Sequence, residues 1–190
     1  MRRLLMMGFS AWVLGLAACS APPPVDQASS GPEPDTPVQD IMNNVMAPAL
    51  DEAFILPDIL TDAAAAKAAN PGDVDAAWAR VKHGAVTLTE IPNLVVIPGR
   101  RITKPGGSVT GESGGGYLRS AEIEARFRDH RPELLKAARK LQEAGLVAQA
   151  AAARRDAKAL LDLGIDIEVV CEGCHKQFWY SPKVAESAEQ

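Results

Sequence analysis

The sequence predicts an all-α protein, and more specifically an antiparallel four-helix bundle. Apolar residues recur at helical rather than alternating spacing from residue 38 to about residue 182, and this region is rich in alanine. Most links between the expected helices are short, which favours antiparallel neighbours. The length of residues 38–182 suits a single domain.

The first two expected helices are bounded by prolines. The first covers residues 37–54, with Pro37 as a favourable first-turn residue, and Pro48 should kink it. The second covers residues 73–97 and ends at the Pro-Gly pair that follows.

The last two expected helices are longer and follow a glycine-rich connection over residues 99–116. The third covers residues 120–154 as one helix, with acidic side chains near its positive N-terminal end. The fourth covers residues 156–178. Aromatic residues are only 5% of the chain, which is few for a helical core of this size.

The N-terminal residues predict export. Arg2 and Arg3 precede an apolar run that is too short to span a bilayer comfortably, as in a signal peptide over residues 1–18. Residues 16–19 read Leu-Ala-Ala-Cys and resemble a bacterial lipobox, which implies cleavage before Cys19 and acylation of that residue. The alternative is an ordinary secretory signal in which Cys19 is incidental. Either interpretation places the mature chain outside the cytoplasm.

The segments that flank the expected domain are polar. Residues 19–37 are rich in Pro, Ser, Asp and Gly and predict a flexible tether, and residues 183–190 predict a C-terminal tail. The lipobox resemblance, with Ser20 rather than Asp after the cysteine, implies a periplasm-facing protein anchored to the outer membrane. The formal net charge of −4 and the absence of a basic stripe argue against a nucleic-acid partner.

The most specific motif is Cys-Glu-Gly-Cys-His at residues 171–175. A C-x-x-C-H sequence in an exported protein indicates covalent attachment of one haem c. On a helix, Cys171, Cys174 and His175 share one stripe, so two thiols can add to the haem vinyl groups and the imidazole can reach the iron. The alternatives are a redox dithiol, which needs a βαβ context, and half of a zinc site, which needs further ligands.

These motifs resemble those of the cytochrome c-prime superfamily. The similarity rests on residues 171–175, on the Phe-Trp-Tyr sequence at residues 178–180, and on a methionine-bearing first helix at residues 38–42. It covers residues 38–182 and implies an exported four-helix bundle with haem on the last helix. By this resemblance the chain looks closer to the low-spin type, in which a methionine of the first helix fills the sixth iron position. The lipobox and the extended loop at residues 99–116 depart from the family.

Met42 is the expected sixth ligand, and His175 is the expected fifth. Helical phasing places Met42 near the centre of the apolar stripe of the first helix and Met46 at its edge. Packing in the core is the alternative role for either methionine. His130 is the rival ligand because it shares a face with Ile123 and Phe127. Two observations weaken this assignment: Pro132 follows closely and can break the helical phase, and a satisfied core histidine is the commoner case.

Two further interpretations concern charged or polar residues near these elements. His83 falls opposite the apolar stripe of the second helix and is expected to be solvated. Arg100 and Arg101 open the long loop and are candidates to pair with haem propionates, although an ordinary solvated pair is favoured.

The function that follows is one-electron transfer by a single haem c, with redox partner proteins that the sequence does not identify. The residues form no nucleophile–base arrangement, so an enzyme is not expected. The superfamily resemblance leaves a homodimer open. Two alternatives remain: a scavenger or sensor that binds NO or CO at an open sixth position, and a structural lipoprotein in which haem supplies stability.

Overall fold

The computed structural model of the protein describes residues 34–55 and 71–187. The regular structure of these residues is helical, and their one isolated β-bridge joins Tyr117 to Tyr180. The prediction of an all-α protein is therefore confirmed. None of the helices in this part of the chain is long and apolar enough to cross a membrane.

Three predictions fall partly or wholly outside the described residues. These are the signal peptide over residues 1–18, the lipid-attachment residue Cys19 with most of the tether, and residues 188–190 of the predicted tail. The preceding part of that tail belongs to a short helix, α9 (Pro182–Ser187), which the sequence did not predict.

Helical structure begins with one unbroken segment over residues 38–55. It consists of α1 (Val38–Ile41), a π-helical turn (Met42–Met46), α2 (Ala47–Leu50) and a second π-helical turn (Asp51–Ile55). Pro48 has no N–H to donate to the preceding turn, which interrupts the α-helical hydrogen-bond ladder. The π turn over Met42–Met46 lies directly before this proline, where the α-helical hydrogen bond is missing.

In the structure the glycine-rich connection covers residues 96–119, and it supports the start of this segment. The N–H of Val38 donates to the carbonyl of Arg101 at 2.9 Å, and that of Gln39 donates to the carbonyl of Ile102 at 3.1 Å. These bonds satisfy two of the donors that a helix N-terminus leaves unpaired. Ile102 and Val109 are at most 2% exposed, so the connection contributes apolar side chains to the core as well as linking helices.

Helix α5 (Pro71–Val95) packs closely against two neighbours. A Cβ atom on Gly84 would lie 2.7 Å from the carbonyl oxygen of Ala49 in the first segment. A Cβ atom on Gly145, in α7, would lie 2.8 Å from the Cα of Thr89 in α5. Glycine at these two positions lets the backbones approach more closely than any other residue would.

The third predicted helix is two helices, α6 (Ser120–Asp129) and α7 (Arg131–Arg154), so the expectation of one continuous helix was wrong. The break lies at His130, which has φ −114° and ψ 43°. Pro132 explains it, because a proline ring clashes with the carbonyl four residues earlier and is tolerated only in the first turn of a helix. A new helix therefore starts at Arg131.

Helix α8 (Ala157–Phe178) begins where the sequence predicted. The carboxylate of Asp156 caps it by accepting the N–H of Ala159 at 3.0 Å. Arg155, with φ 55°, makes the tight link from α7. Ala148, Ala151 and Ala152 are at most 1% exposed, and their small side chains bring α7 close to its neighbours.

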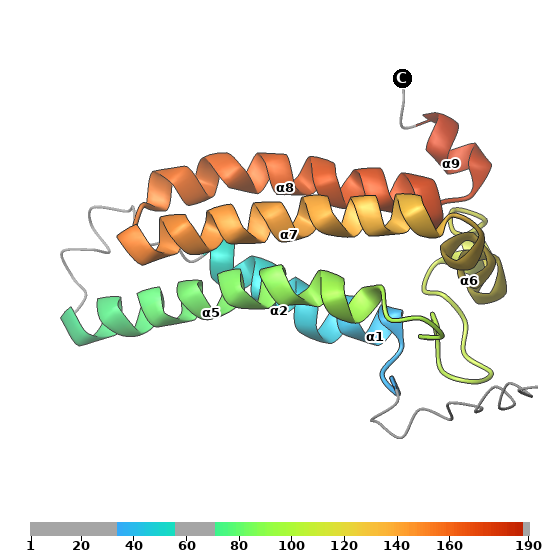
Figure 1. Cartoon of the computed structure of the whole chain (residues 1–190), viewed down its shortest axis with the longest axis horizontal. Coiled ribbons are helices and arrows are strands. Elements are labelled where there is room, and N and C mark those ends of the chain that lie inside the picture. Colours follow the sequence, from blue (N-terminus) through green and yellow to red (C-terminus); the bar gives the residue numbers. More distant parts are fainter. Residues whose placement is uncertain (1–33, 56–70, 188–190) are drawn as a thin grey trace, which may run out of the picture. The chain divides into compact units, whose positions relative to one another are not determined.

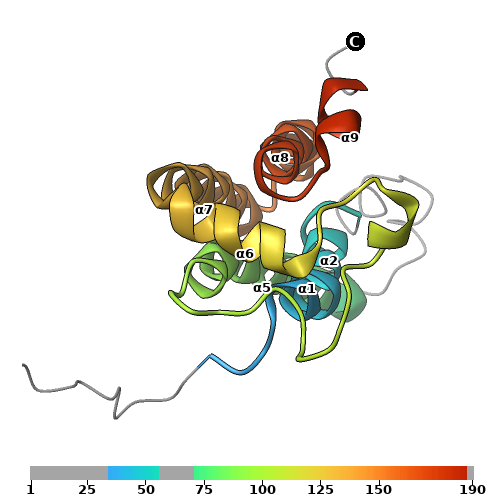
Figure 2. The ribbon, with the colours of Figure 1, turned by 90° about the vertical axis from the view of Figure 1, so that its right-hand side faces the viewer.

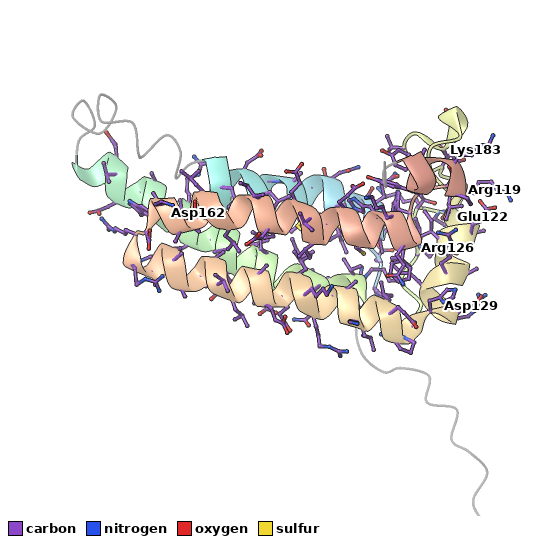
Figure 3. The ribbon with its side chains drawn as sticks, turned by 90° about the horizontal axis from the view of Figure 1, so that it is seen from above. Arg119, Glu122, Arg126, Asp129, Asp162 and Lys183 are labelled. Atoms are coloured by element: carbon purple, nitrogen blue, oxygen red, sulfur yellow. The ribbon has the colours of Figure 1, made fainter. Side chains whose placement is uncertain are left out.

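The segment over residues 38–55, α5, α7 and α8 lie lengthwise beside one another (Figure 1). Helix α6 crosses one end of this arrangement (Figure 2) and packs on α7 and α8. Arg126 of α6, labelled in Figure 3, donates to the carbonyl of Gln177 at 2.9 Å and ties α6 to the last turn of α8.

The close helix contact at Gly145 generates a prediction about stability. Gly145→Ala should lower the free energy of unfolding by about 1–2 kcal/mol, because the added methyl group overlaps Thr89 by more than the gain in helix propensity can offset. Urea denaturation followed by circular dichroism measures the change.

Gly164→Ala in α8 is the matched control for Gly145→Ala. Its Cβ would meet Phe54 at 3.6 Å, an ordinary contact, so the substitution should stabilise the protein by about 0.5–1 kcal/mol. Equal effects of the two substitutions would contradict the close packing of α5 on α7.

Candidate functional site

The predicted motif lies in the last two turns of α8 and borders a cavity. Cys171, Cys174 and His175 are all half-buried, and all three line one hollow of about 430 Å³. Residues spaced three and four apart share a helix face. The volume falls within the range of small-molecule and cofactor sites.

Helix α7 and the elements around it supply a mainly apolar lining. From α7 the lining includes Leu134, Ala137, Ala138 and Leu141. The two alanines are small, so they leave room between α7 and the motif. Val95 of α5 and Phe127 of α6 complete this side, and the ring of Phe127 meets that of Phe178 edge-on at 5.5 Å.

Met42 and Met46 of the first segment both line the cavity that contains the motif. Met42 is half-buried, whereas Met46 is 5% exposed and lies in the core instead of at the edge of the stripe that the sequence predicted. The reason is the π turn over Met42–Met46. A π turn holds more residues than an α turn and so rotates less per residue, which shifts Met46 inward from the position that regular α-helical phasing gives it.

Burial raises the pKa of both thiols. That of Cys174 rises to about 11, with a smaller contribution from Cys171, and the charge of Glu168 adds to the rise at Cys171. A nucleophilic redox dithiol needs the opposite, a lowered pKa that favours the thiolate. The environment of the motif therefore argues against a thioredoxin-like dithiol. Among residues 34–55 and 71–187, no three His, Cys, Asp or Glu side chains cluster as a metal site.

Burial lowers the pKa of His175, against a smaller opposing effect of Glu172. The imidazole is therefore neutral at neutral pH, which is the form that coordinates a metal. The rings of Trp179 and Tyr180 lie 6.4 Å and 6.0 Å from that of His175 and line the same cavity.

The end of α8 is held by the glycine-rich connection. The N–H of Leu118 donates to the carbonyl of Trp179 at 2.9 Å, and the N–H of Ser181 donates to the carbonyl of Gly116 at 3.1 Å. The hydroxyl of Tyr180 donates to the carboxylate of Glu172, inside the motif, at 2.8 Å. These contacts fix the aromatic residues that follow the motif beside the cavity.

The structure places the rival ligand and the predicted arginines away from the cavity lining. His130 is exposed at the break between α6 and α7. His83 is exposed, as expected, and its Nδ1 lies 2.7 Å from Glu52. Arg100 donates to the carbonyl of Leu94 at 2.7 Å and to that of Thr36, so it supports the end of α5 and the start of the first segment.

Sequence reasoning missed the polar residues of the lining, which are Gln39, Asn43, Thr110 and Tyr117. The Oε1 of Gln39 accepts the N–H of Thr110 at 2.8 Å, which fixes the connection against the first segment. A signal for Gln39 was present, because it precedes Met42 by three residues and so shares its helix face. Thr110 and Tyr117 come from the connection and had no such signal.

The chain was compared with known proteins as a whole. No protein-family model matches it, and neither a curated protein nor a solved structure does. Inferences about function therefore rest on the residues and their arrangement.

The hydrogen bond between Tyr180 and Glu172 gives a prediction about pH. Burial, assisted by this bond, raises the pKa of Tyr180 from 10.0 to about 12. A raised pKa means that the stabilisation is complete below about pH 10 and is lost as the pH rises toward 12. Tyr180→Phe should lower the free energy of unfolding by about 1–2 kcal/mol at neutral pH and flatten its decline above pH 10, as measured by urea unfolding.

Tyr117→Phe is the control for this measurement. It keeps the ring contact with Tyr180, whose centroid is 5.4 Å away, and leaves the bond to Glu172 in place. An alkaline decline that is as steep in Tyr180→Phe as in Tyr117→Phe would show that the bond has no such effect.

Proposed function

We propose that this chain is a c-type cytochrome that carries one covalently bound haem in an antiparallel four-helix bundle and transfers single electrons. The observation that carries the proposal is the shared cavity. Two thiols and an imidazole at C-x-x-C-H spacing line one hollow with a methionine from a different helical segment. That set of donors fits a haem held by thioether bonds, with nitrogen and sulfur as axial ligands.

Each residue of the site has a defined role in this proposal. Cys171 and Cys174 would form the two thioether bonds to the haem. His175, kept neutral by its buried position, would be the fifth iron ligand, and Met42 the sixth. Burial raises the pKa of both thiols and so favours their protonated form, which disfavours a disulfide or a metal–thiolate site at this motif.

The remaining residues of the cavity lining support one-electron chemistry because they limit the access of water and add no charge. The haem supplies the redox couple, and the protein supplies axial ligation, a low dielectric and orientation. Phe127, Leu134 and Phe178 are apolar residues of this lining and limit the access of water. Polar residues at the cavity, among them Gln39 and Thr110, are held by their own hydrogen bond and add no charge.

The location and partners are part of the same proposal. Acylation of Cys19 would anchor the protein to a membrane, with the folded domain facing the periplasm. The serine that follows Cys19 favours the outer membrane as that membrane. The formal net charge of −4 argues against nucleic acid as a partner. The redox partner proteins of this proposal follow from the haem motif and not from the charge.

Covalent attachment is tested by extraction. Haem should stay on the wild-type polypeptide after treatment with acid and acetone, when the protein is matured with haem available. It should be released from the Cys171→Ala/Cys174→Ala variant, because no thioether bonds can form. The absorbance of the precipitated polypeptide measures both results.

The Cys19→Ala variant is the control for attachment, since it removes the third cysteine of the chain and leaves the motif intact. It should retain haem as the wild type does. A wild-type protein that carries no haem after maturation would refute the proposed function.

The identity of the sixth ligand is tested by substituting, one at a time, the two methionines that line the cavity. Met42→Ala should convert a low-spin haem to high-spin and let CO bind readily, because the sulfur that opposes an incoming diatomic is removed. Met46→Ala, its matched control, should leave the absorption spectrum nearly unchanged.

Two other outcomes of this experiment would change the assignment. Loss of the low-spin spectrum in Met46→Ala alone would make Met46 the ligand. A wild type that is already high-spin and takes up CO at once would leave Met42 as a packing residue and favour the NO- or CO-binding function.

A further inference from the structure

A second hollow reaches the motif from the outer surface of the helices. This α7–α8 groove has a volume of about 310 Å³ and is lined by Lys136 and Lys140 of α7 and by Val169, Gly173, Cys174 and Gln177 of α8, among others. Cys174 lines both this groove and the cavity described above. It is therefore the residue of the motif that separates the cavity from the groove.

Gly173 has no packing reason to be glycine. It lies inside α8, where glycine is less favourable than alanine, and no heavy atom lies within 4 Å of the position that a Cβ would take. This differs from Gly84 and Gly145, whose neighbours leave no room for a side chain. A bare helix surface beside Cys174 instead gives another molecule space to approach the motif closely.

The charges on the groove indicate the kind of molecule. Lys136 and Lys140 are exposed and form no ion pair with any carboxylate in the described part of the chain, whereas Lys104 and Lys158 pair with Asp40 and Asp162 at 3.0 Å and 2.6 Å. Glu133 is the one acidic residue that lines the groove. The lining is thus net positive on a chain whose overall charge is −4.

Helix α8 presents an exposed apolar area next to these two lysines of α7. Val169 is 68% exposed and Ile165, one turn earlier, is 69% exposed. Exposed apolar side chains beside charged groups are typical of protein interaction sites. The combination of a small apolar area, unpaired lysines and an open approach to Cys174 fits a protein surface that carries carboxylates.

We propose that the α7–α8 groove is the docking site for a redox protein that presents carboxylates around its own redox centre, and that the electron crosses at Cys174. This inference rests on the proposed function, since the haem would be bound to that sulfur. The step moves one electron between the haem iron and the partner's centre. No bond forms or breaks, and no proton is transferred.

The charge component is tested with inorganic probes, because the partner is unidentified. Stopped-flow mixing of the reduced holoprotein with hexacyanoferrate(III), an anionic oxidant, should be slowed about tenfold by Lys136→Glu/Lys140→Glu. Lys82→Glu/Lys158→Glu changes the net charge equally at remote positions and should alter the rate less than about twofold. Tris(phenanthroline)cobalt(III), a cationic oxidant, should react faster with the groove variant.

Binding is measured separately from electron transfer. Hexacyanocobaltate(III), an anion that accepts no electron here, should shift the amide signals of Gly173 and Gln177 in nuclear magnetic resonance spectra of the wild-type holoprotein. The shifts should disappear in the groove variant and persist in the remote variant. Shifts of equal size all over the surface would overturn the site.

The role of Gly173 is tested by two substitutions at this position. Gly173→Ala should raise Tm, which shows that the fold does not need glycine there. Gly173→Leu should slow oxidation by both probes, because the added side chain covers Cys174, whereas Ala150→Leu at an exposed position of α7 should not. A lower Tm for Gly173→Ala would overturn this part of the inference.

The outcomes distinguish the docking site from the function. A wild-type protein without haem refutes both. A protein with haem whose oxidation rates are the same in the groove and remote variants refutes the docking site alone. A wild-type dimer that the groove variant dissociates in sedimentation experiments would make the groove an interface between copies, which also refutes the proposal.

Discussion

The close approach of α5 to its two neighbours fixes the positions of the first segment and of α7, and with them the walls of the cavity. Gly84 admits the backbone of the first segment on one side, and Gly145 of α7 admits Thr89 on the other. Because these backbones are nearly in contact, the first segment and α7 are held at fixed distances from α5. Helix α8 then packs on α7, and the cavity is lined by its last two turns and by the first segment. A wider separation at either glycine would change the walls of the cavity before any residue of the motif was altered.

The glycine-rich connection has a larger part in the site than its composition suggests. Its carbonyls cap the first turn of α1, and its buried side chains Ile102 and Val109 join the core. Further along, Gly116 and Leu118 bond to the residues that follow α8. One connection thus fixes both the start of the methionine-bearing segment and the end of the motif-bearing helix. In the proposed function this connection keeps the distance between the two iron ligands constant, because those ligands would come from these two elements.

The sequence was sufficient for features governed by local chemistry and insufficient for those set by tertiary contact. The start of α8 could be predicted because Asp156 caps it, and the shared face of Cys171 and His175 follows from helical spacing. Pro132 signalled a possible break in phase near His130, but the sequence alone did not show that the chain ends one helix and starts another there. The inward position of Met46 depends on a π turn, which regular α-helical phasing cannot represent. The contribution of Tyr117 to the lining depends on a long connection whose path only the folded chain determines.

The π turn over Met42–Met46 also affects how this protein can change during evolution. A π turn is equivalent to one extra residue inserted in an α-helix, and it absorbs that residue locally, so Ile41 before it and Ala49 after it can both face the core. Deleting one residue within the turn would restore regular α geometry and leave these two flanks facing the core. In a regular α-helix such as α8, the same deletion would rotate one part of the helix by about 100° relative to the other. A change of one residue in length is therefore easier to accommodate in this segment than in the helices around it.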